Sequence, residues 1–112
     1  MAKINRDGVE IYYEVHGQGP TLLMSHGYSA TAQMWRGQIA ALAPHVQLVP
    51  WDMRGHGRSD YPEDQAQYSA LHTVADMAAI LDAVGAERAI IGGLSLGGYM
   101  SLYFHALHPE RT

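Results

Sequence analysis

The sequence predicts an α/β domain, in which an N-terminal β-hairpin is followed by a mostly parallel sheet flanked by helices. Three observations predict this class. Asp7-Gly8 separates two short alternating segments, strand-like and helix-like segments then alternate along the chain, and a glycine-flanked serine stands between the last strand and the last helix. A chain of 112 residues suffices for one domain, which we expect to span residues 1–112.

Each element follows from a local pattern. The hairpin is predicted within residues 4–15, because Asp-Gly between alternating segments favours a two-residue turn. The other strand-like segments are short apolar runs, at residues 21–25, 46–49 and 89–91. The helix-like segments have apolar residues three and four apart or are mostly apolar without proline, at residues 31–42, 71–84 and 98–107. Since strands and helices alternate, the strands after the hairpin are expected to be parallel.

Polar and conformationally special residues predict where these elements begin and end. Ser69 is the expected cap of the second helix, and Gly85 is its expected stop. Pro50 lacks an N–H, so we expect it to mark the end of a strand or an edge of the sheet. Asp76 and Asp82 lie in the second helix and are expected on its solvated face.

Composition excludes several classes of function. The formal net charge is −4 and no Lys/Arg cluster occurs, so neither nucleic acid nor an anionic membrane is an expected partner. The absence of cysteine excludes disulfides, thiolate metal sites and a cysteine nucleophile. No His/Asp/Glu set has metal-ligand spacing, and we expect no metal and no cofactor. No signal-peptide pattern or membrane-spanning apolar run is present, which predicts a cytoplasmic protein.

The most informative segment is Gly93-Leu94-Ser95-Leu96-Gly97. A residue at the tip of a sharp strand-to-helix turn adopts a strained backbone conformation and points its side chain out of the fold. Side chains two positions before and after that residue would collide, so both positions favour glycine. The pattern therefore predicts that Ser95 is a nucleophile.

Two further motifs follow predicted strands. They are His26-Gly27-Tyr28 and the run Asp52-Met53-Arg54-Gly55-His56-Gly57-Arg58-Ser59. In open α/β sheets, ligands bind outside the carboxyl ends of the strands. Both motifs and Ser95 are therefore expected on the side of the sheet where chemistry takes place.

These three motifs, in this order, resemble the N-terminal half of an α/β-hydrolase, and the likeness spans nearly the whole chain. The resemblance implies a fold built around the glycine-flanked serine, with Ser95 as the nucleophile and Gly93 and Gly97 as the elbow glycines. It also implies two oxyanion-hole donors, the backbone N–H groups of Leu96 and Tyr28.

The same resemblance assigns shaping roles to the remaining motif residues. The histidines of His-Gly and Arg-Gly-His-Gly usually shape loops in this family and do not act as the catalytic base. We therefore expect His26, Gly27, Arg54 and His56 to shape the loops near the site. Asp52 ends a strand and is expected to anchor its loop, and we do not expect it to be the triad acid.

The triad order in this fold is serine, acid, histidine, and the acid and histidine lie on later loops. We therefore expect a partial α/β-hydrolase domain that is truncated before the sixth strand, with the acid and histidine absent. Without a base the hydroxyl of Ser95 is a weak nucleophile, so the 112-residue chain alone is expected to be inactive. The strand at residues 89–91 would leave an open apolar sheet edge, which predicts self-association.

The favoured function is a serine esterase or lactonase acting on a small-molecule ester or lactone. Serine at position 95 excludes relatives with an aspartate nucleophile, such as haloalkane dehalogenases and epoxide hydrolases. Leu94 is similar to the residue found in 3-oxoadipate enol-lactonase-like and cofactor-free haloperoxidase-like members, whereas C–C bond hydrolases usually have asparagine there. A haloperoxidase-like enzyme or a C–C bond hydrolase stays open, as does an inactive fragment or a ligand-binding module of the same fold.

Overall fold

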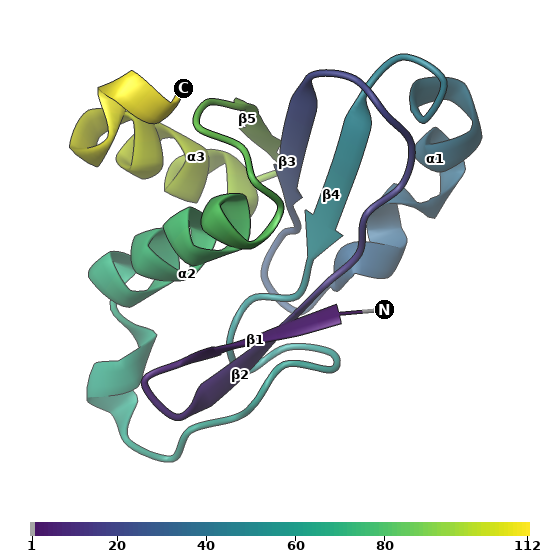
Figure 1. The fold of residues 1–112 in the computed structure, drawn as a ribbon. Coiled ribbons are helices and arrows are strands. Elements are labelled where there is room, and N and C mark those ends of the chain that lie inside the picture. Colours follow the sequence, from purple (N-terminus) through teal and green to yellow (C-terminus); the bar gives the residue numbers. More distant parts are fainter. Residues whose placement is uncertain (1) are drawn as a thin grey trace.

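A computed structural model describes residues 2–112 and contains one five-stranded sheet with helices on both faces (Figure 1). The strands are β1 (Ala2–Arg6), β2 (Val9–Tyr13), β3 (Thr21–Ser25), β4 (Gln47–Trp51) and β5 (Ile90–Gly93). The α-helices are α1 (Arg36–Leu42), α2 (Ala70–Ala83) and α3 (Leu96–Leu107). Short 3-10 helices complete the set: η1 (Ala32–Trp35), η2 (Gln65–Tyr68) and η3 (Pro109–Arg111). Figure 1 shows α2 and α3 on one face of the sheet and α1 on the other.

The strand order is β1-β2-β4-β3-β5. β3 pairs in parallel with both β4 and β5, while β1 and β2 form the antiparallel hairpin. The predicted α/β class with a leading hairpin is therefore confirmed. Asp7 and Gly8 both have positive φ, at 54° and 89°, as a type I′ turn requires.

The predicted boundaries of α2 are also confirmed. The Ser69 hydroxyl accepts a hydrogen bond from the backbone N–H of His72 at 3.2 Å. Gly85 follows the helix with φ 75°, and its N–H donates to the carbonyl of Asp82 at 3.1 Å. A glycine with positive φ directly after the last turn closes a helix without a steric penalty.

The expectation for Pro50 is wrong, because Pro50 lies inside β4 between β2 and β3. Its carbonyl accepts from the N–H of Glu14 at 2.9 Å, and the hydrogen bond that a residue-50 N–H would return to Glu14 is missing. The ladder continues on either side: Asp52 N–H donates to Tyr12 at 3.0 Å, and His16 and Leu48 exchange two bonds. One lost donor is tolerated because the neighbouring bonds keep the two strands in register.

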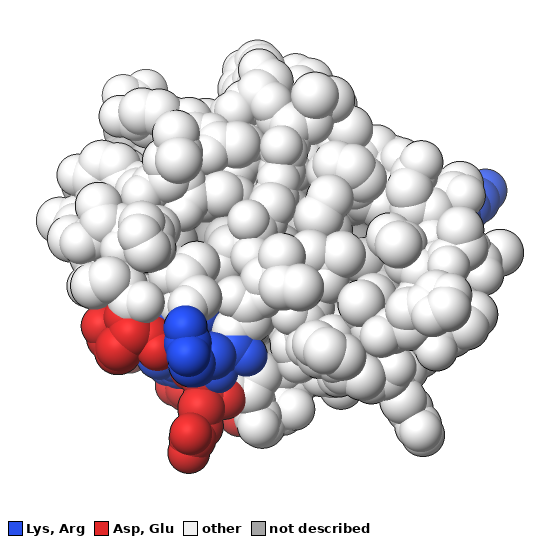
Figure 2. All heavy atoms as spheres, turned by 90° about the horizontal axis from the view of Figure 1, so that it is seen from above, with Lys and Arg blue, Asp and Glu red and all other residues white. Residues whose placement is uncertain are grey.

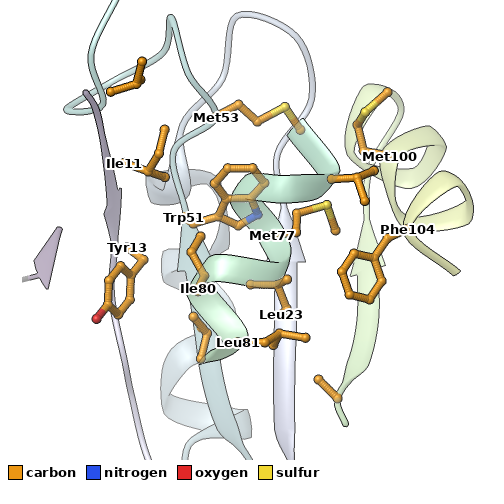
Figure 3. Close-up of a cluster of buried hydrophobic side chains, with 14 residues drawn as sticks. Ile11, Tyr13, Leu23, Trp51, Met53, Met77, Ile80, Leu81, Met100 and Phe104 are labelled. Carbon is orange, nitrogen blue, oxygen red and sulfur yellow. The ribbon is translucent and has the colours of Figure 1, made fainter. Parts of the chain in front are cut away.

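The hydrophobic core lies between the sheet and the two helices α2 and α3 (Figure 3). Trp51 is fully buried at its centre, and its ring N–H donates to the hydroxyl of Ser25 at 2.8 Å, so no polar atom of the indole is left unpaired. Around it pack side chains of the sheet, of α2 and of α3: Ile11, Leu23, Met77, Ile80, Leu81, Met100 and Phe104.

The expectation that Asp76 is solvated is also wrong, whereas Asp82 is exposed as expected, with 70% of its side-chain surface accessible. The Asp76 side chain has no accessible surface. Its two oxygens accept from Arg54 Nε and Nη2 at 2.7 and 2.8 Å, and Oδ1 also accepts from Arg6 Nε at 2.5 Å. This cluster joins the hairpin, the loop after β4 and helix α2, which are far apart in the sequence.

Replacing Asp76 by alanine would leave the buried guanidinium of Arg54 without its carboxylate. We expect Asp76→Ala to lower the free energy of unfolding by about 3–5 kcal/mol, measured by urea denaturation. Asp82→Ala, on the exposed face of the same helix, is the matched control and should cost no more than about 1 kcal/mol. Equal losses in the two variants would show that the buried cluster does not stabilise the fold.

Candidate functional site

Ser95 occupies the turn between β5 and α3, with φ 55° and ψ −114°. A non-glycine residue with positive φ is strained, and it persists only where its surroundings hold it in place. Its side chain is exposed, and within residues 2–112 its hydroxyl has no hydrogen-bond partner. The backbone thus presents a free hydroxyl at the carboxyl end of β5.

The two flanking glycines permit this turn to lie against the end of β3. A Cβ on Gly97 would lie 2.1 Å from the carbonyl oxygen of Ser25, and a Cβ on Gly93 would lie 2.4 Å from the carbonyl carbon of Gly97. Neither distance is compatible with a side chain, and in each case the obstacle is backbone that cannot move aside. The N–H of Leu94 also donates to the carbonyl of Ser25 at 3.2 Å. The elbow is therefore fixed to β3 through its backbone.

The loop after β3 lies beside this elbow. A Cβ built on Gly27 would be 3.8 Å from the Cβ of Ser95. Within residues 2–112, the backbone N–H groups of Tyr28 and Leu96 donate no hydrogen bond. Tyr28 and Leu96 also line one cavity of about 170 Å³. Two unpaired backbone donors next to an exposed hydroxyl form a site that can hold a negatively charged oxygen.

His26 joins the loop after β3 to the loop after β4. Its Nδ1–H donates to the carbonyl of Gly27 at 2.7 Å, and its Nε2 accepts from the N–H of Met53 at 2.9 Å. These partners require the neutral ring with its proton on Nδ1. Burial lowers the pKa of His26 below the ordinary value, against an opposing effect of the bond to Gly27. With both nitrogens used, this ring cannot accept a proton from Ser95.

His56 makes the reciprocal connection from the loop after β4. Its Nε2 accepts from the N–H of Ser29 at 3.2 Å, and its Nδ1–H donates to the carbonyl of Arg54 at 3.2 Å. The two imidazole rings lie 4.8 Å apart, and the ring of Tyr28 meets His56 edge-on at 5.8 Å. Each loop therefore holds the backbone of the other through one histidine.

Asp52 directs its carboxylate to the backbone of two other segments. Oδ1 accepts from the N–H of Ala32 at 2.6 Å, and Oδ2 accepts from the N–H of Arg58 at 2.9 Å. Gly57 passes so close that a Cβ there would lie 2.3 Å from Oδ2. Asp52 is buried, and among residues 2–112 no hydrogen bond joins its carboxylate to Ser95 or to either histidine.

The structure brings together residues from all three motifs and adds one pair that the sequence did not reveal. The sequence predicts that Arg54 shapes its loop but does not predict its partner Asp76, whose carboxylate also accepts from Arg6. Within residues 2–112, no three His, Asp or Glu side chains are grouped so that they could hold a metal ion. None of the helices in the same residues has the length and apolar character needed to cross a bilayer.

A larger cavity of about 550 Å³ lies at the opposite ends of the strands, between the segment before β5 and η3. Figure 2 views the molecule from above Figure 1. It shows a mixed group of acidic and basic side chains at the lower left and further basic atoms at the right edge, while most of that face is free of charged side chains. Two of the lining residues, Arg111 and Asp82, pair with each other at 3.0 Å. Because the charges of Arg111 and Asp82 compensate each other and the described residues that line this cavity include no serine or histidine, we place the candidate site at Ser95.

Comparison with known proteins identifies the family of the chain. The sequence model described as the alpha/beta hydrolase fold matches residues 20–111. The chain belongs to the α/β-hydrolase fold family.

Relatives within this family carry different activities in their names. A putative carbamate hydrolase, RutD, of Azorhizobium caulinodans is 39% identical over 103 residues, which cover 92% of this chain and 38% of the relative. A pimeloyl-[acyl-carrier protein] methyl ester esterase of Pectobacterium carotovorum is also 39% identical, covering 91% and 38%. The crystal structure of an epoxide hydrolase from Vigna radiata superimposes with a TM-score of 0.91 at 28% identity, covering 98% of this chain and 36% of that one. This α/β-hydrolase chain therefore spans less than two fifths of the length of these relatives.

The contact of Gly97 with Ser25 predicts a strong steric effect. Gly97→Ala should lower the free energy of unfolding by about 3 kcal/mol, because the new methyl group would overlap immovable backbone. Gly37→Ala is the matched control, since Gly37 lies in α1 with nothing within 4 Å of its built Cβ. Alanine should stabilise that helix by about 0.5–1 kcal/mol. Urea denaturation measures both, and effects of the same sign would contradict the prediction.

The lowered pKa of His26 predicts that acid destabilises the fold. Below the ordinary histidine pKa of about 6.5, the unfolded chain takes up a proton that folded His26 resists, so the free energy of unfolding falls as the pH falls. Its contribution is fully present above about pH 6.5 and is lost below it. We expect His26→Gln to show a shallower loss of stability between pH 7 and pH 5 in urea titrations. An unchanged slope would mean that His26 is not responsible.

Proposed function

We propose that this chain provides the nucleophile and the oxyanion hole of a serine hydrolase that cleaves a carboxylic ester or lactone, as part of a full-length α/β-hydrolase. One observation carries the proposal: the exposed Ser95, held at positive φ, lies beside the N–H groups of Tyr28 and Leu96, two backbone donors that have no partner among residues 2–112. An exposed nucleophile next to preorganised donors is the arrangement that acyl transfer requires.

In the proposed reaction, the Oγ of Ser95 attacks the substrate carbonyl carbon and its proton passes to a general base. The carbonyl oxygen becomes an oxyanion that accepts hydrogen bonds from Leu96 and Tyr28. Collapse of this intermediate breaks the ester C–O bond, and the alcohol oxygen takes the proton from the base. Water then attacks the acyl-enzyme, releasing the acid and restoring the Ser95 hydroxyl. The proposal places the base, a histidine, beyond residue 112, in keeping with the triad order of this fold.

The choice of an acyl substrate over an epoxide rests on the identity of the nucleophile. Attack by a serine hydroxyl on an epoxide carbon forms an ether, which has no carbonyl that water could attack in a second step. A carboxylate nucleophile instead forms an ester, which water can cleave. The two relatives named as a carbamate hydrolase and a methyl ester esterase both act, by their names, on an acyl carbon, which supports this choice.

Within this class we propose a lactonase-like substrate preference, supported by Leu94 before the nucleophile. The Leu94 side chain is more than half exposed next to the elbow. The alternative is a ligand-binding module of the same fold without turnover. One observation favours that alternative: within residues 2–112, no side chain is hydrogen-bonded to Ser95 as a base would be.

A fluorophosphonate probe and an ester assay on the full-length protein test the proposal. We expect the probe to label Ser95, identified by peptide mass, and p-nitrophenyl butyrate hydrolysis to fall at least a hundredfold in Ser95→Ala, because the acyl-enzyme cannot form. Ser101→Ala is the matched control, since this buried serine of the same helix already donates to the carbonyl of Gly97 at 2.7 Å. It should keep both labelling and turnover.

Two results would reject the proposal. Full activity in Ser95→Ala would show that Ser95 is not the nucleophile. Failure of the probe to label the wild-type protein, together with no ester hydrolysis, would favour the binding module.

A further inference from the structure

A second hollow adjoins the oxyanion site and is built largely from aromatic side chains. It has a volume of about 380 Å³, and its lining includes Tyr28, Tyr61, Tyr68 and His56. The 170 Å³ cavity that reaches Leu96 shares Tyr28, His56 and Tyr68 with it. We call the larger hollow the tyrosine pocket. It opens beside the two backbone donors that would hold the carbonyl oxygen.

Three of the four aromatic side chains of this wall, those of Tyr61, Tyr68 and His56, have their polar atoms bonded to the protein backbone. The Tyr61 hydroxyl donates to the carbonyl of Gly57 at 3.0 Å, and the Tyr68 hydroxyl donates to the carbonyl of Pro62 at 2.6 Å. Both nitrogens of His56 are bonded to backbone as well. These three side chains therefore offer only their ring surfaces to a ligand, because their hydrogen-bonding groups already bind the protein backbone.

The one charged residue that lines the pocket, Arg54, is also hydrogen-bonded within the protein. Arg54 is 2% exposed, and its guanidinium forms two bonds to Asp76 and one to the carbonyl of Gln67 at 2.8 Å. Its positive charge is compensated before any ligand arrives. The lining contains no Asp or Glu. A charged ligand would thus lose its hydration in this pocket without gaining a counter-ion.

Tyr68 is the part of the wall that packs against the backbone, whereas Tyr28 and Tyr61 are 79% and 61% exposed. The ring of Tyr68 covers Gly55, where an added Cβ would lie 2.7 Å from the Tyr68 Cε1. Gly55 has φ 76°, so glycine is favoured there on both steric and conformational grounds. A ring that is already held in place binds a ligand without the cost of ordering that side chain.

We infer that the tyrosine pocket is a specificity subsite for an uncharged aromatic group of the substrate. Aromatic rings gain from edge-to-face and offset contacts with other rings beyond the burial of their area. The volume of the pocket falls within the range of about 300–1,000 Å³ typical of small-molecule sites. This inference rests on the proposed function, because it places the aromatic group next to the ester carbonyl held at Ser95.

Binding of three ketone and acid probes tests the subsite without requiring turnover. Acetophenone, cyclohexyl methyl ketone and benzoate match in the number of non-hydrogen atoms but differ in aromaticity or charge. We expect acetophenone to shift the backbone amide signals of Tyr28, His56 and Tyr68 in NMR titrations of the protein. Its affinity should exceed that of the cyclohexyl ketone at least fivefold and that of benzoate at least tenfold.

Three leucine variants locate the effect. Tyr61→Leu and Tyr28→Leu remove a ring from the wall but keep an apolar side chain, and each should reduce the acetophenone preference at least threefold. Tyr99→Leu is the matched control, because Tyr99 is an exposed tyrosine of α3 outside the pocket lining, and it should change nothing. Equal affinities for the three probes, or shifts confined to other residues, would overturn the inference.

Turnover measurements separate the two proposals. Ser95→Ala should abolish hydrolysis of phenyl acetate and methyl benzoate. The affinity of the protein for acetophenone should stay unchanged. If hydrolysis survives in Ser95→Ala but acetophenone still binds the pocket, the proposed nucleophile is wrong and the subsite stands. If hydrolysis needs Ser95 but aromatic and cyclohexyl acetates or methyl esters react equally fast, the subsite is wrong and the nucleophile stands.

Discussion

The close backbone contact between the Ser95 elbow and the end of β3 is the constraint on which the site depends. Gly97 lies against the carbonyl of Ser25, and Leu94 donates to that same carbonyl. This contact places the first turn of α3 directly beside the loop after β3. The loop that carries Tyr28 and the turn that carries Ser95 and Leu96 lie side by side because nothing larger than glycine separates the two backbones.

Around this contact, side chains that look catalytic hold backbone groups of neighbouring loops. His26 and His56 each bond the backbone of both loops, and Asp52 accepts from two backbone N–H groups. Arg54 is held in turn by Asp76 on α2. Buried polar groups that are fully paired make loops rigid, and rigid loops are what an oxyanion site and a preformed pocket both require.

Most of the architecture could be predicted from the sequence because its signals are local. Asp7-Gly8 favours one turn type, Ser69 and Gly85 delimit α2, and alternating strands and helices imply parallel pairing. The two wrong expectations concern long-range pairing. Pro50 is tolerated inside β4 because bonds on either side of it survive, and Asp76 is buried because Arg6, 70 residues away, and Arg54 reach it. Helical periodicity alone carries no information about such partners.

The sequence by itself determined the fold class, the strained serine turn and the three motifs at the carboxyl ends of the strands, because these depend on short-range sterics and periodicity. Only the tertiary structure decided which polar groups remain free. It shows His26, His56, Asp52 and Arg54 engaged with other groups, and leaves the Ser95 hydroxyl and two backbone donors without partners among residues 2–112. The physical reason is that a polar group finds a partner only where another segment of the chain lies next to it in the fold. The local sequence does not specify which distant segments become neighbours.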